Sequence, residues 1–380
     1  MSTLYTALAI HVALSLPDSA KVMVGTTRAQ IIDSGALTVP LFHPHKPITT
    51  TPNNVAPATL QKVIVVYGAT GTQGTAITLS LLQSKQNFAV RALTRKPESK
   101  KAQRLSALGA EVVKADWFNN DEMKAALKNA WGFWLNTHHH DPAVTDPEGP
   151  TDEDLGRRLV SLAAEAGVKV FIYSTCESPA KITNGKAPVP GMDAKSRVEH
   201  FARTIPSFDA VIGAWPAWYF ENFIDPEYAR AFGGFPLLSD DEGYYTFTSP
   251  RVGGQGTVQT VSVADDFGEM VHAMFLNPLR WAGCTVPCMS DAFSYEVTGK
   301  KARYIPMDSY RDFPTHDSTV LAELQDVYRY MQSANGGFFG KPDDVETCQR
   351  LKDEARRDKG LAPQRVTTMR EYFVRHYGGK

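Results

Sequence analysis

The stretch "VVYGATGTQGTA", residues 65–76, decides the fold of this protein. An apolar run ends at Gly68, and glycines recur at Gly71 and Gly74 with only small or polar residues between them. An ordinary surface turn needs one glycine, so three at this spacing require another explanation. A dinucleotide-binding turn provides one. Its first glycine permits the tight turn, its second lets the backbone approach a pyrophosphate, and its third lets the following helix pack closely.

The regular alternation of strands and helices around this stretch supports the interpretation. Short apolar runs suited to buried parallel strands occupy residues 62–67, 87–94, 111–116, 131–137 and 168–175. Segments with helical spacing separate them, at residues 75–84, 99–110, 121–130 and 151–167. Thr151 and Asp154 form a capping pair at the start of the last of these helices. The order predicts an α/β fold, a doubly wound parallel sheet of the Rossmann type.

Composition restricts the class of protein. The chain has 380 residues, 43% of them hydrophobic, and a formal net charge of −1, as in ordinary soluble globular proteins. This charge balance gives no electrostatic case for broad binding to nucleic acid or to a membrane surface. Four cysteines are too few for a disulfide framework, which favours a reducing compartment. We therefore expect a cytoplasmic protein, with the nucleus as a second compartment, and neither direct nucleic-acid binding nor membrane binding.

The first 58 residues differ from the rest. Five prolines lie between Val39 and Pro57, which is typical of an extended linker. We expect residues 1–58 to be an N-terminal extension, residues 59–215 to be the nucleotide-binding domain and residues 216–380 to form a second lobe interleaved with it.

The end of the second predicted strand indicates the cofactor. NAD-binding proteins usually place an acidic residue there for the ribose 2′-hydroxyl, whereas a 2′-phosphate requires a cation. This chain has Arg95 and Lys96 at that point and no acid before Glu98. The position favours NADP(H), since a guanidinium can hold a phosphate through two hydrogen bonds. The alternative is a solvated basic loop.

Several segments together resemble the NmrA-like family of atypical short-chain dehydrogenases/reductases. They are "YGATGTQG" (67–74), "VRALTRKP" (90–97), "LGAEVVKADWFNNDEMKAAL" (108–127), "FIYSTCES" (171–178), "AKSRVEHFART" (194–204) and "WYFENF" (218–223). The resemblance runs in order from Lys62 to about Phe223 and more thinly beyond. It implies a Rossmann domain with a smaller α+β C-terminal lobe that closes over the cofactor. The family includes reductases, some of them in fungal secondary metabolism, and redox-sensing regulators.

The resemblance also implies a cofactor site. The pyrophosphate would lie on the turn formed by Gly68, Ala69, Thr70, Gly71, Thr72, Gln73 and Gly74. The 2′-phosphate would lie at Arg95, Lys96 and Ser99, and the adenine end at Asp116 and Trp117. Asn136, Thr137 and His138 would line the central section, Lys195 would reach the nicotinamide ribose, and Tyr219, Phe220, Glu221 and Asn222 would lie beside the nicotinamide. Alternatives stay open: Asp116 could cap a turn, Lys195 could pair with Glu199, and Tyr219 and Phe220 could be core aromatics.

The expected proton donor is missing. Short-chain dehydrogenases use Tyr-x-x-x-Lys, in which the lysine lowers the tyrosine pKa. Here Gly191 stands four residues before Lys195. Ser174 lies near the expected serine position, and Lys195 could itself act as the acid if a dry pocket lowered its pKa. Two functions therefore remain: an NADPH-dependent reductase of a small carbonyl, imine or enone, and a non-catalytic NADP sensor that signals to a protein partner.

Two further stretches carry expectations of their own. In "THHHD", residues 137–141, adjacent side chains of an extended chain point in different directions, so we expect no metal site. His138 should face the substrate, and the two histidines after it should face solvent. We expect residues 284–304 to pass from a strand almost directly to the end of a helix, where the family usually has a longer helical stretch. They predict a shortened C-terminal lobe.

Overall fold

The computed structural model describes residues 61–86, 88–252, 258–294, 300–316 and 318–377. Among them, the strands of the main sheet are β1 (Lys62–Val66), β2 (Phe88–Thr94), β3 (Glu111–Lys114), β4 (Ala130–Leu135), β5 (Val170–Ser174), β6 (Ala210–Pro216) and β10 (Thr285–Cys288). Their order is β10-β6-β5-β4-β1-β2-β3, and every neighbouring pair is parallel. This confirms the predicted doubly wound parallel sheet. The proposed extension, residues 1–58, lies outside the described residues.

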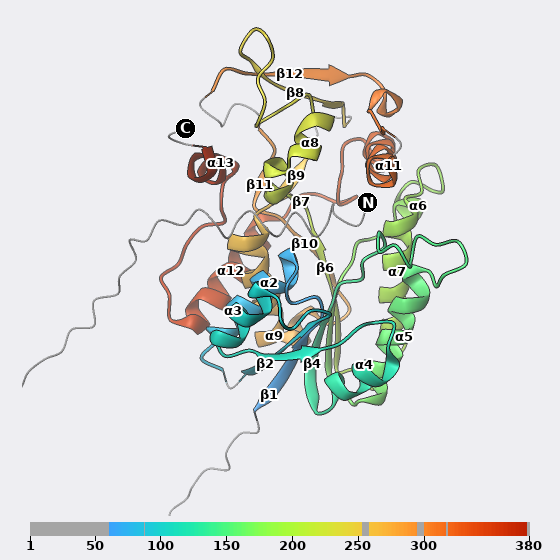
Figure 1. The fold of residues 1–380 in the computed structure, drawn as a ribbon, viewed down its shortest axis with the longest axis vertical. Helices are drawn as coiled ribbons and strands as arrows, with labels where there is room; N and C mark the ends of the chain where they lie inside the picture. The colour runs from blue at the N-terminus through green and yellow to red at the C-terminus, as the bar shows by residue number, and fades with distance from the viewer. Residues whose placement is uncertain (1–60, 87, 253–257, 295–299, 317, 378–380) are drawn as a thin grey trace, which may run out of the picture.

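Helices cover both faces of this sheet (Figure 1). One face carries α2 (Thr72–Leu82), α3 (Lys100–Ala107), α9 (Gly268–Leu276) and α12 (Val345–Lys359); the other carries α4 (Asn120–Leu127), α5 (Asp152–Glu165) and α7 (Pro190–Arg203). Side chains alternate along each strand, so the sheet separates two apolar cores. Ile64 and Val66 of β1 belong to the core under α2, and Val65 belongs to the core under α5.

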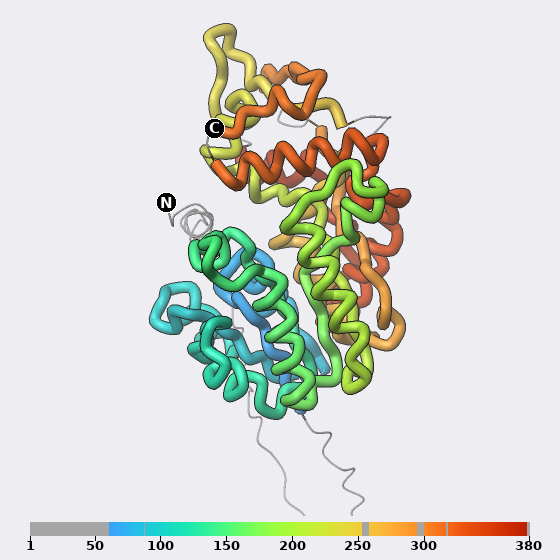
Figure 2. Tube along the Cα trace, turned by 90° about the vertical axis from the view of Figure 1, so that its right-hand side faces the viewer, coloured from blue at the N-terminus to red at the C-terminus, as the bar shows by residue number. Residues whose placement is uncertain are grey.

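The C-terminal part of the chain forms a lobe beyond the carboxyl ends of the strands, drawn yellow to red in Figure 2. It contains a sheet of β7 (Trp218–Tyr219), β9 (Gln259–Val261) and β11 (Asp291–Ala292), and the parallel pair β8 (Tyr245–Pro250) and β12 (Ala302–Met307). Its helices include α8 (Pro226–Ala231), α11 (Thr319–Ser333) and α13 (Met369–Tyr377), and short helices occur at α6 (Pro179–Ile182), α10 (Pro278–Trp281), η1 (Phe220–Ile224), η2 (Val263–Phe267) and η4 (Tyr310–Asp312).

One strand pair of this lobe joins distant segments. Residues 302–307 form strand β12, which pairs with β8. The helix end expected within residues 284–304 falls partly on residues 295–299, which lie outside the described residues. The pairing joins segments more than fifty residues apart, from Ala302 with Tyr245 to Met307 with Pro250. Neither segment has a marked local signal, because the partner and not the local sequence makes each one a strand.

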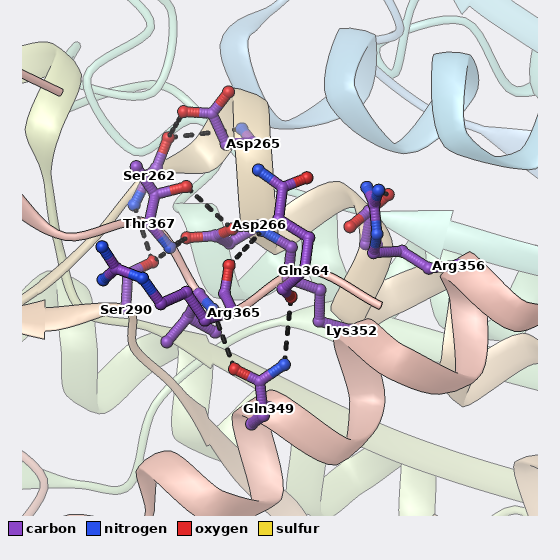
Figure 3. Close-up of polar contacts among 12 residues, drawn as sticks. Ser262, Asp265, Asp266, Ser290, Gln349, Lys352, Arg356, Gln364, Arg365 and Thr367 are labelled. Carbon is purple, nitrogen blue, oxygen red and sulfur yellow. Dashed lines mark hydrogen bonds and ion pairs between the residues drawn. The ribbon is translucent and has the colours of Figure 1, made fainter. Parts of the chain in front are cut away.

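A buried ion pair fastens the C-terminal segment to the rest of the chain (Figure 3). The carboxylate of Asp266 in η2 contacts the ammonium of Lys352 in α12, and both side chains are almost wholly inaccessible to solvent. The carboxylate also accepts hydrogen bonds from Ser290 Oγ at 2.5 Å and from the backbone N–H of Thr367 at 2.8 Å. Lys352 donates in turn to the carbonyl of Arg365 at 3.0 Å. The buried charges are thus both paired and hydrogen-bonded, which is the condition under which burial is tolerated.

Asp266→Ala should therefore make the folded protein markedly less stable. Removing one partner of a buried pair leaves an uncompensated charge and typically lowers the free energy of unfolding by about 3–5 kcal/mol. The matched control is Asp308→Ala, since Asp308 pairs with Arg251 on the surface and such pairs contribute at most about 1 kcal/mol. Denaturant titration of both variants measures the difference. Equal stabilities would contradict a structural role for the buried pair.

Candidate functional site

The order of the strands defines where a ligand can enter. Strand β1 lies between β2 and β4, so the direction of winding reverses between β1 and β4. In doubly wound sheets, ligands bind outside the carboxyl ends of the strands at such a reversal. Two segments lie at this position: the glycine turn that follows β1, and residues 136–141 that follow β4.

The glycine turn has the geometry that its sequence predicts. Gly68 has φ +66°, in the left-handed region that favours glycine. A Cβ on Gly74 would lie only 2.3 Å from the carbonyl oxygen of Gly68, so the helix start fits against the turn only without a side chain. Among the described residues, no side chain caps the N-terminus of α2 and its first turn carries no acid. Its free N–H groups and positive dipole end suit an anion.

The residues between the glycines mainly hold the turn in place. Ala69 is buried and its N–H donates to the carbonyl of Leu93 at 3.0 Å. The hydroxyls of Thr70 and Thr94 lie 3.2 Å apart, and Thr72 begins α2. The buried Gln73 side chain donates to the hydroxyl of Tyr219, which joins the turn to the C-terminal lobe.

A cleft of about 520 Å³ opens at the ends of β2 and β3. Arg95, Lys114, Asp116 and Phe118 are among the residues that line it. The guanidinium of Arg95 is half exposed and forms an ion pair with the buried carboxylate of Asp141, with 2.9 Å between Nη1 and Oδ2. Charged and polar groups of both signs thus gather at the predicted 2′-phosphate and adenosine positions, since Asp121 and Glu122 line the cleft as well.

The other residues predicted for this end differ in role. Lys96 is exposed, and Ser99 caps α3 by accepting a hydrogen bond from Ala102 N–H. Asp116 lines the cleft and also accepts from Phe118 N–H at 3.1 Å, so it caps a turn as well. Trp117 is only 1% exposed and stacks on Tyr67, which makes its side chain part of the core.

A hydrogen-bonded network joins Lys195 to the segment of residues 136–141 that follows β4. Its ammonium donates to the carbonyl oxygen of Thr137 at 2.8 Å and to the hydroxyl of Thr137 at 2.7 Å. That hydroxyl donates to Asp152 at 2.9 Å and lies 2.8 Å from the hydroxyl of Tyr173. Burial, followed by the charge of Asp152, raises the pKa of Tyr173 well above its usual value, so this phenol stays neutral. Ser174 ends β5 and is buried, and Asn136 is half buried.

Lys195 does not pair with Glu199, which was the alternative role for this lysine. Glu199 instead forms an ion pair with Arg203 at 2.5 Å and accepts from Thr285 at 2.9 Å. Lys195 is 13% exposed and its ammonium lies 4.0 Å from Asp152.

The space where the missing tyrosine would project is filled by other groups. A Cβ on Gly191 would lie 2.8 Å from Glu323 Oε1 and 3.0 Å from His139 Cδ2. Gly191 lies one helical turn before Lys195 on α7, so both face the same side of that helix. The phenol is therefore not simply absent: histidine and carboxylate side chains stand in its place.

These side chains belong to a three-residue cluster. Glu323 Oε2 on α11 lies 2.8 Å from His139 Nε2 and 2.9 Å from His140 Nε2. Burial would raise the pKa of Glu323, but hydrogen bonds from the two histidines and their charges lower it well below its usual range. The two imidazole rings lie 4.0 Å apart and are half buried against Glu323, whereas we expected them to face solvent.

A turn explains the difference. Asp141 N–H donates to the carbonyl of His138 at 2.9 Å, so His139 and His140 are the central residues of a turn and not part of an extended chain. In a turn, consecutive side chains can lie on one side. His138 is half buried, and burial lowers its pKa to about 4.

The four residues predicted beside the nicotinamide have separate environments. Phe220 is fully buried and packs on Tyr372, as a core aromatic does. Glu221 is buried and accepts hydrogen bonds from the N–H groups of Val263 and Ala264, at the start of η2. Burial raises the pKa of Glu221 to about 7 despite these hydrogen bonds. Tyr219 and Asn222 are half buried, and Tyr219 contacts the glycine turn through its hydrogen bond with Gln73.

Comparison with known proteins identifies the family. The family model for the NmrA-like family matches residues 60–373. The chain is 38% identical over 332 residues to the NmrA-like family domain-containing oxidoreductase hkm9 of Aspergillus hancockii, covering 84% of this chain and 98% of that protein. It is also 38% identical over 330 residues to FrzB of Cladobotryum sp, covering 83% and 98%. The chain belongs to the NmrA-like family.

Solved structures share the fold of this NmrA-like protein. The negative transcriptional regulator NmrA matches with a TM-score of 0.64 and 17% identity, over 84% of this chain and 96% of that one. The NADPH-dependent quinone oxidoreductase QOR2 of Escherichia coli, complexed with NADPH, matches with a TM-score of 0.58 and 19% identity, over 83% and 99%. At these identities the likeness concerns the fold alone. In the described part of the chain, no helix is long and apolar enough to cross a membrane.

Sequence reasoning missed the acidic and phenolic partners in this NmrA-like protein. Asp141 holds Arg95, Asp152 and Tyr173 surround Thr137, and Glu323 holds the histidines. Glu323 is 184 residues from His139 along the chain, so no local pattern could connect them. A local signal for Asp152 did exist, because it begins the helix whose Thr151–Asp154 capping box was predicted and is present.

The close fit of the turn gives a test. Gly74→Ala places a methyl group 2.3 Å from the Gly68 carbonyl oxygen, and such overpacking typically costs about 1–3 kcal/mol of folding free energy. Gly337→Ala is the matched control, since its Cβ would have no neighbour nearer than 3.5 Å. Thermal melting should show a lower Tm for Gly74→Ala only. Equal melting of the two variants would show that the turn has room for a side chain.

Proposed function

We propose that this protein is an oxidoreductase that binds NADP(H) and reduces a small carbonyl, imine or enone substrate. The observation that carries the proposal is the glycine turn at the β1–β4 reversal, with Arg95 lining a cleft at the ends of β2 and β3. The relatives that are 38% identical are named as oxidoreductases, and the similar fold of QOR2 holds NADPH.

The residues present fit a phosphorylated dinucleotide. The turn keeps the Gly68 carbonyl and the start of α2 so close that a Cβ at Gly74 would collide, which leaves backbone N–H groups facing outward for a pyrophosphate. Arg95 provides a half-exposed guanidinium for a 2′-phosphate. When bound, NADPH supplies a hydride to the substrate.

Lys195 is the group that we assign to proton transfer. Its two hydrogen bonds to Thr137 fix the ammonium at the end of β4, next to the position expected for a nicotinamide ribose. Thr137 is held in turn by Asp152, so the orientation of the lysine depends on a buried carboxylate. Ser174 lies at the end of the neighbouring strand and would contribute a hydroxyl to the same site.

A second function is favoured by one observation. Short-chain enzymes place a phenol where this chain has Gly191, and the nearest described side chains there are Glu323 and His139. A redox sensor of the NmrA type needs the nucleotide site but no proton donor, and it would signal to a regulatory protein partner. Turnover of NADPH against a panel of carbonyl, imine and enone compounds distinguishes the two functions. NADP(H) binding without turnover of any compound would favour the sensor.

The cofactor choice rests on Arg95. Losing a charge-assisted contact to the 2′-phosphate costs about 1.5–3 kcal/mol, so Arg95→Ala should weaken NADP(H) binding by about tenfold or more. Binding of NAD(H), which lacks that phosphate, should stay nearly unchanged. Calorimetric titration of both nucleotides measures the two effects. The same loss for both nucleotides would remove Arg95 from the 2′-phosphate site.

Lys195→Arg separates the enzyme from the sensor. Arginine keeps the charge and can still donate hydrogen bonds, but it does not release a proton near neutral pH. An enzyme with Lys195 as its acid should keep NADP(H) affinity within a few-fold and lose turnover by about a hundredfold, as is usual for removal of a general acid. The exposed Lys186→Arg is the control. Undiminished turnover by Lys195→Arg would show that another group supplies the proton.

A further inference from the structure

We propose that His139, His140 and Glu323 form a binding site for a divalent transition-metal ion, next to the proposed reaction site. The ligating atoms of these three side chains lie within 4.8 Å of one another. Both Nε2 atoms point at a single carboxylate oxygen, Glu323 Oε2, at 2.8 and 2.9 Å.

The kinds of ligand suit such an ion. Two imidazole nitrogens and one carboxylate oxygen are the donor set of catalytic zinc sites, which keep a fourth position for water or substrate. The same set binds non-haem iron(II). Bonds of about 2.0–2.1 Å to a tetrahedral ion require donor atoms roughly 3.3 Å apart. The two contacts with Glu323 need to open by about half an ångström to reach that separation, and the two histidine nitrogens lie within 4.8 Å of each other.

The backbone arrangement makes the site specific. The histidines are the central residues of the 138–141 turn, and the turn is closed by the hydrogen bond from Asp141 N–H to the carbonyl of His138. Glu323 comes from α11, in the C-terminal lobe. The three donors therefore meet only in the folded protein, so an ion bound there stabilises the native state.

The location gives the ion a role. Gly191 and Lys195 face the same side of α7, and the Gly191 Cβ direction leads to His139 and Glu323. The ion would thus stand where short-chain enzymes place the phenol that polarises the substrate. As a Lewis acid it would accept a lone pair of a substrate carbonyl oxygen. Reduction of that carbonyl needs one hydride and one proton; under the proposed function they come from NADPH and Lys195, and the ion is neither oxidised nor reduced.

Metal binding is tested without a substrate. Protein prepared without a polyhistidine tag is stripped with a chelator and titrated with Zn²⁺ by calorimetry and with Co²⁺ by visible absorption. We expect one equivalent per chain, a cobalt spectrum typical of nitrogen and oxygen ligands, and a higher Tm with zinc. No saturable binding of either ion would overturn the proposal, and the cluster would then be a hydrogen-bonded contact between the loop and α11.

Variants locate the ion. His140→Ala and Glu323→Gln should each weaken zinc binding by more than the roughly 10–100-fold that loss of an outer-shell partner causes. Glu323→Gln keeps the size and a hydrogen-bonding carbonyl, so a folding defect is avoided. His200→Ala, an exposed histidine on α7, is the matched control. Unchanged zinc affinity in Glu323→Gln would place the ion elsewhere and overturn the assignment. Calorimetric NADP(H) binding on the same samples tests the proposed function separately, because that site does not need the ion.

Discussion

The buried pair of Asp266 and Lys352 fastens α12 and the C-terminal segment after it to η2 and α9. Asp266 lies in η2, directly before α9, and α9 packs against the glycine-turn helix α2 so closely that a Cβ on Gly268 would lie 2.5 Å from the carbonyl oxygen of Ala76. Through Ser290 and Thr367 the same carboxylate holds the loop after β10 and the segment before α13. The C-terminal segment thus supports, through α9, the helix at whose N-terminus we propose that the nucleotide binds. Because the charges are buried, this support depends on every partner being present.

The part of the fold between Lys62 and Ser174 could be predicted because its signals are local. Each strand is a short apolar run, each helix has its own spacing and caps, and consecutive units follow one another in space. The C-terminal lobe lacks this property. Strand β10 joins the main sheet beside β6 after an excursion of about seventy residues, and β8 finds its parallel partner β12 across half the lobe. Pairings of this kind are decided by tertiary packing, which a periodicity does not express.

The same distinction applies to the candidate site. The glycine turn and Arg95 are consecutive features of one βαβ unit, so position along the chain was enough to assign them. The charged partners in the candidate site are distant along the chain. Asp141 pairs with Arg95, and Glu323 pairs with His139 and His140. We expected no metal at "THHHD" because adjacent side chains diverge in an extended chain, but residues 138–141 form a turn. A single backbone hydrogen bond therefore changes which side chains can meet.

That turn also connects the cofactor end of the site with the histidine cluster. Asp141, its last residue, carries the ion pair with Arg95, and its central residues carry the contacts with Glu323. The Arg95 side chain is half exposed but the Asp141 carboxylate is buried, and removing the partner of a buried charge costs about 3–5 kcal/mol. A charge-assisted contact to a phosphate contributes about 1.5–3 kcal/mol. Under the proposed function, Arg95 would therefore keep its pair with Asp141 and offer its other N–H groups to a 2′-phosphate. The pair thus joins the proposed 2′-phosphate position to the turn that carries His139 and His140, without any contact between cofactor and histidine.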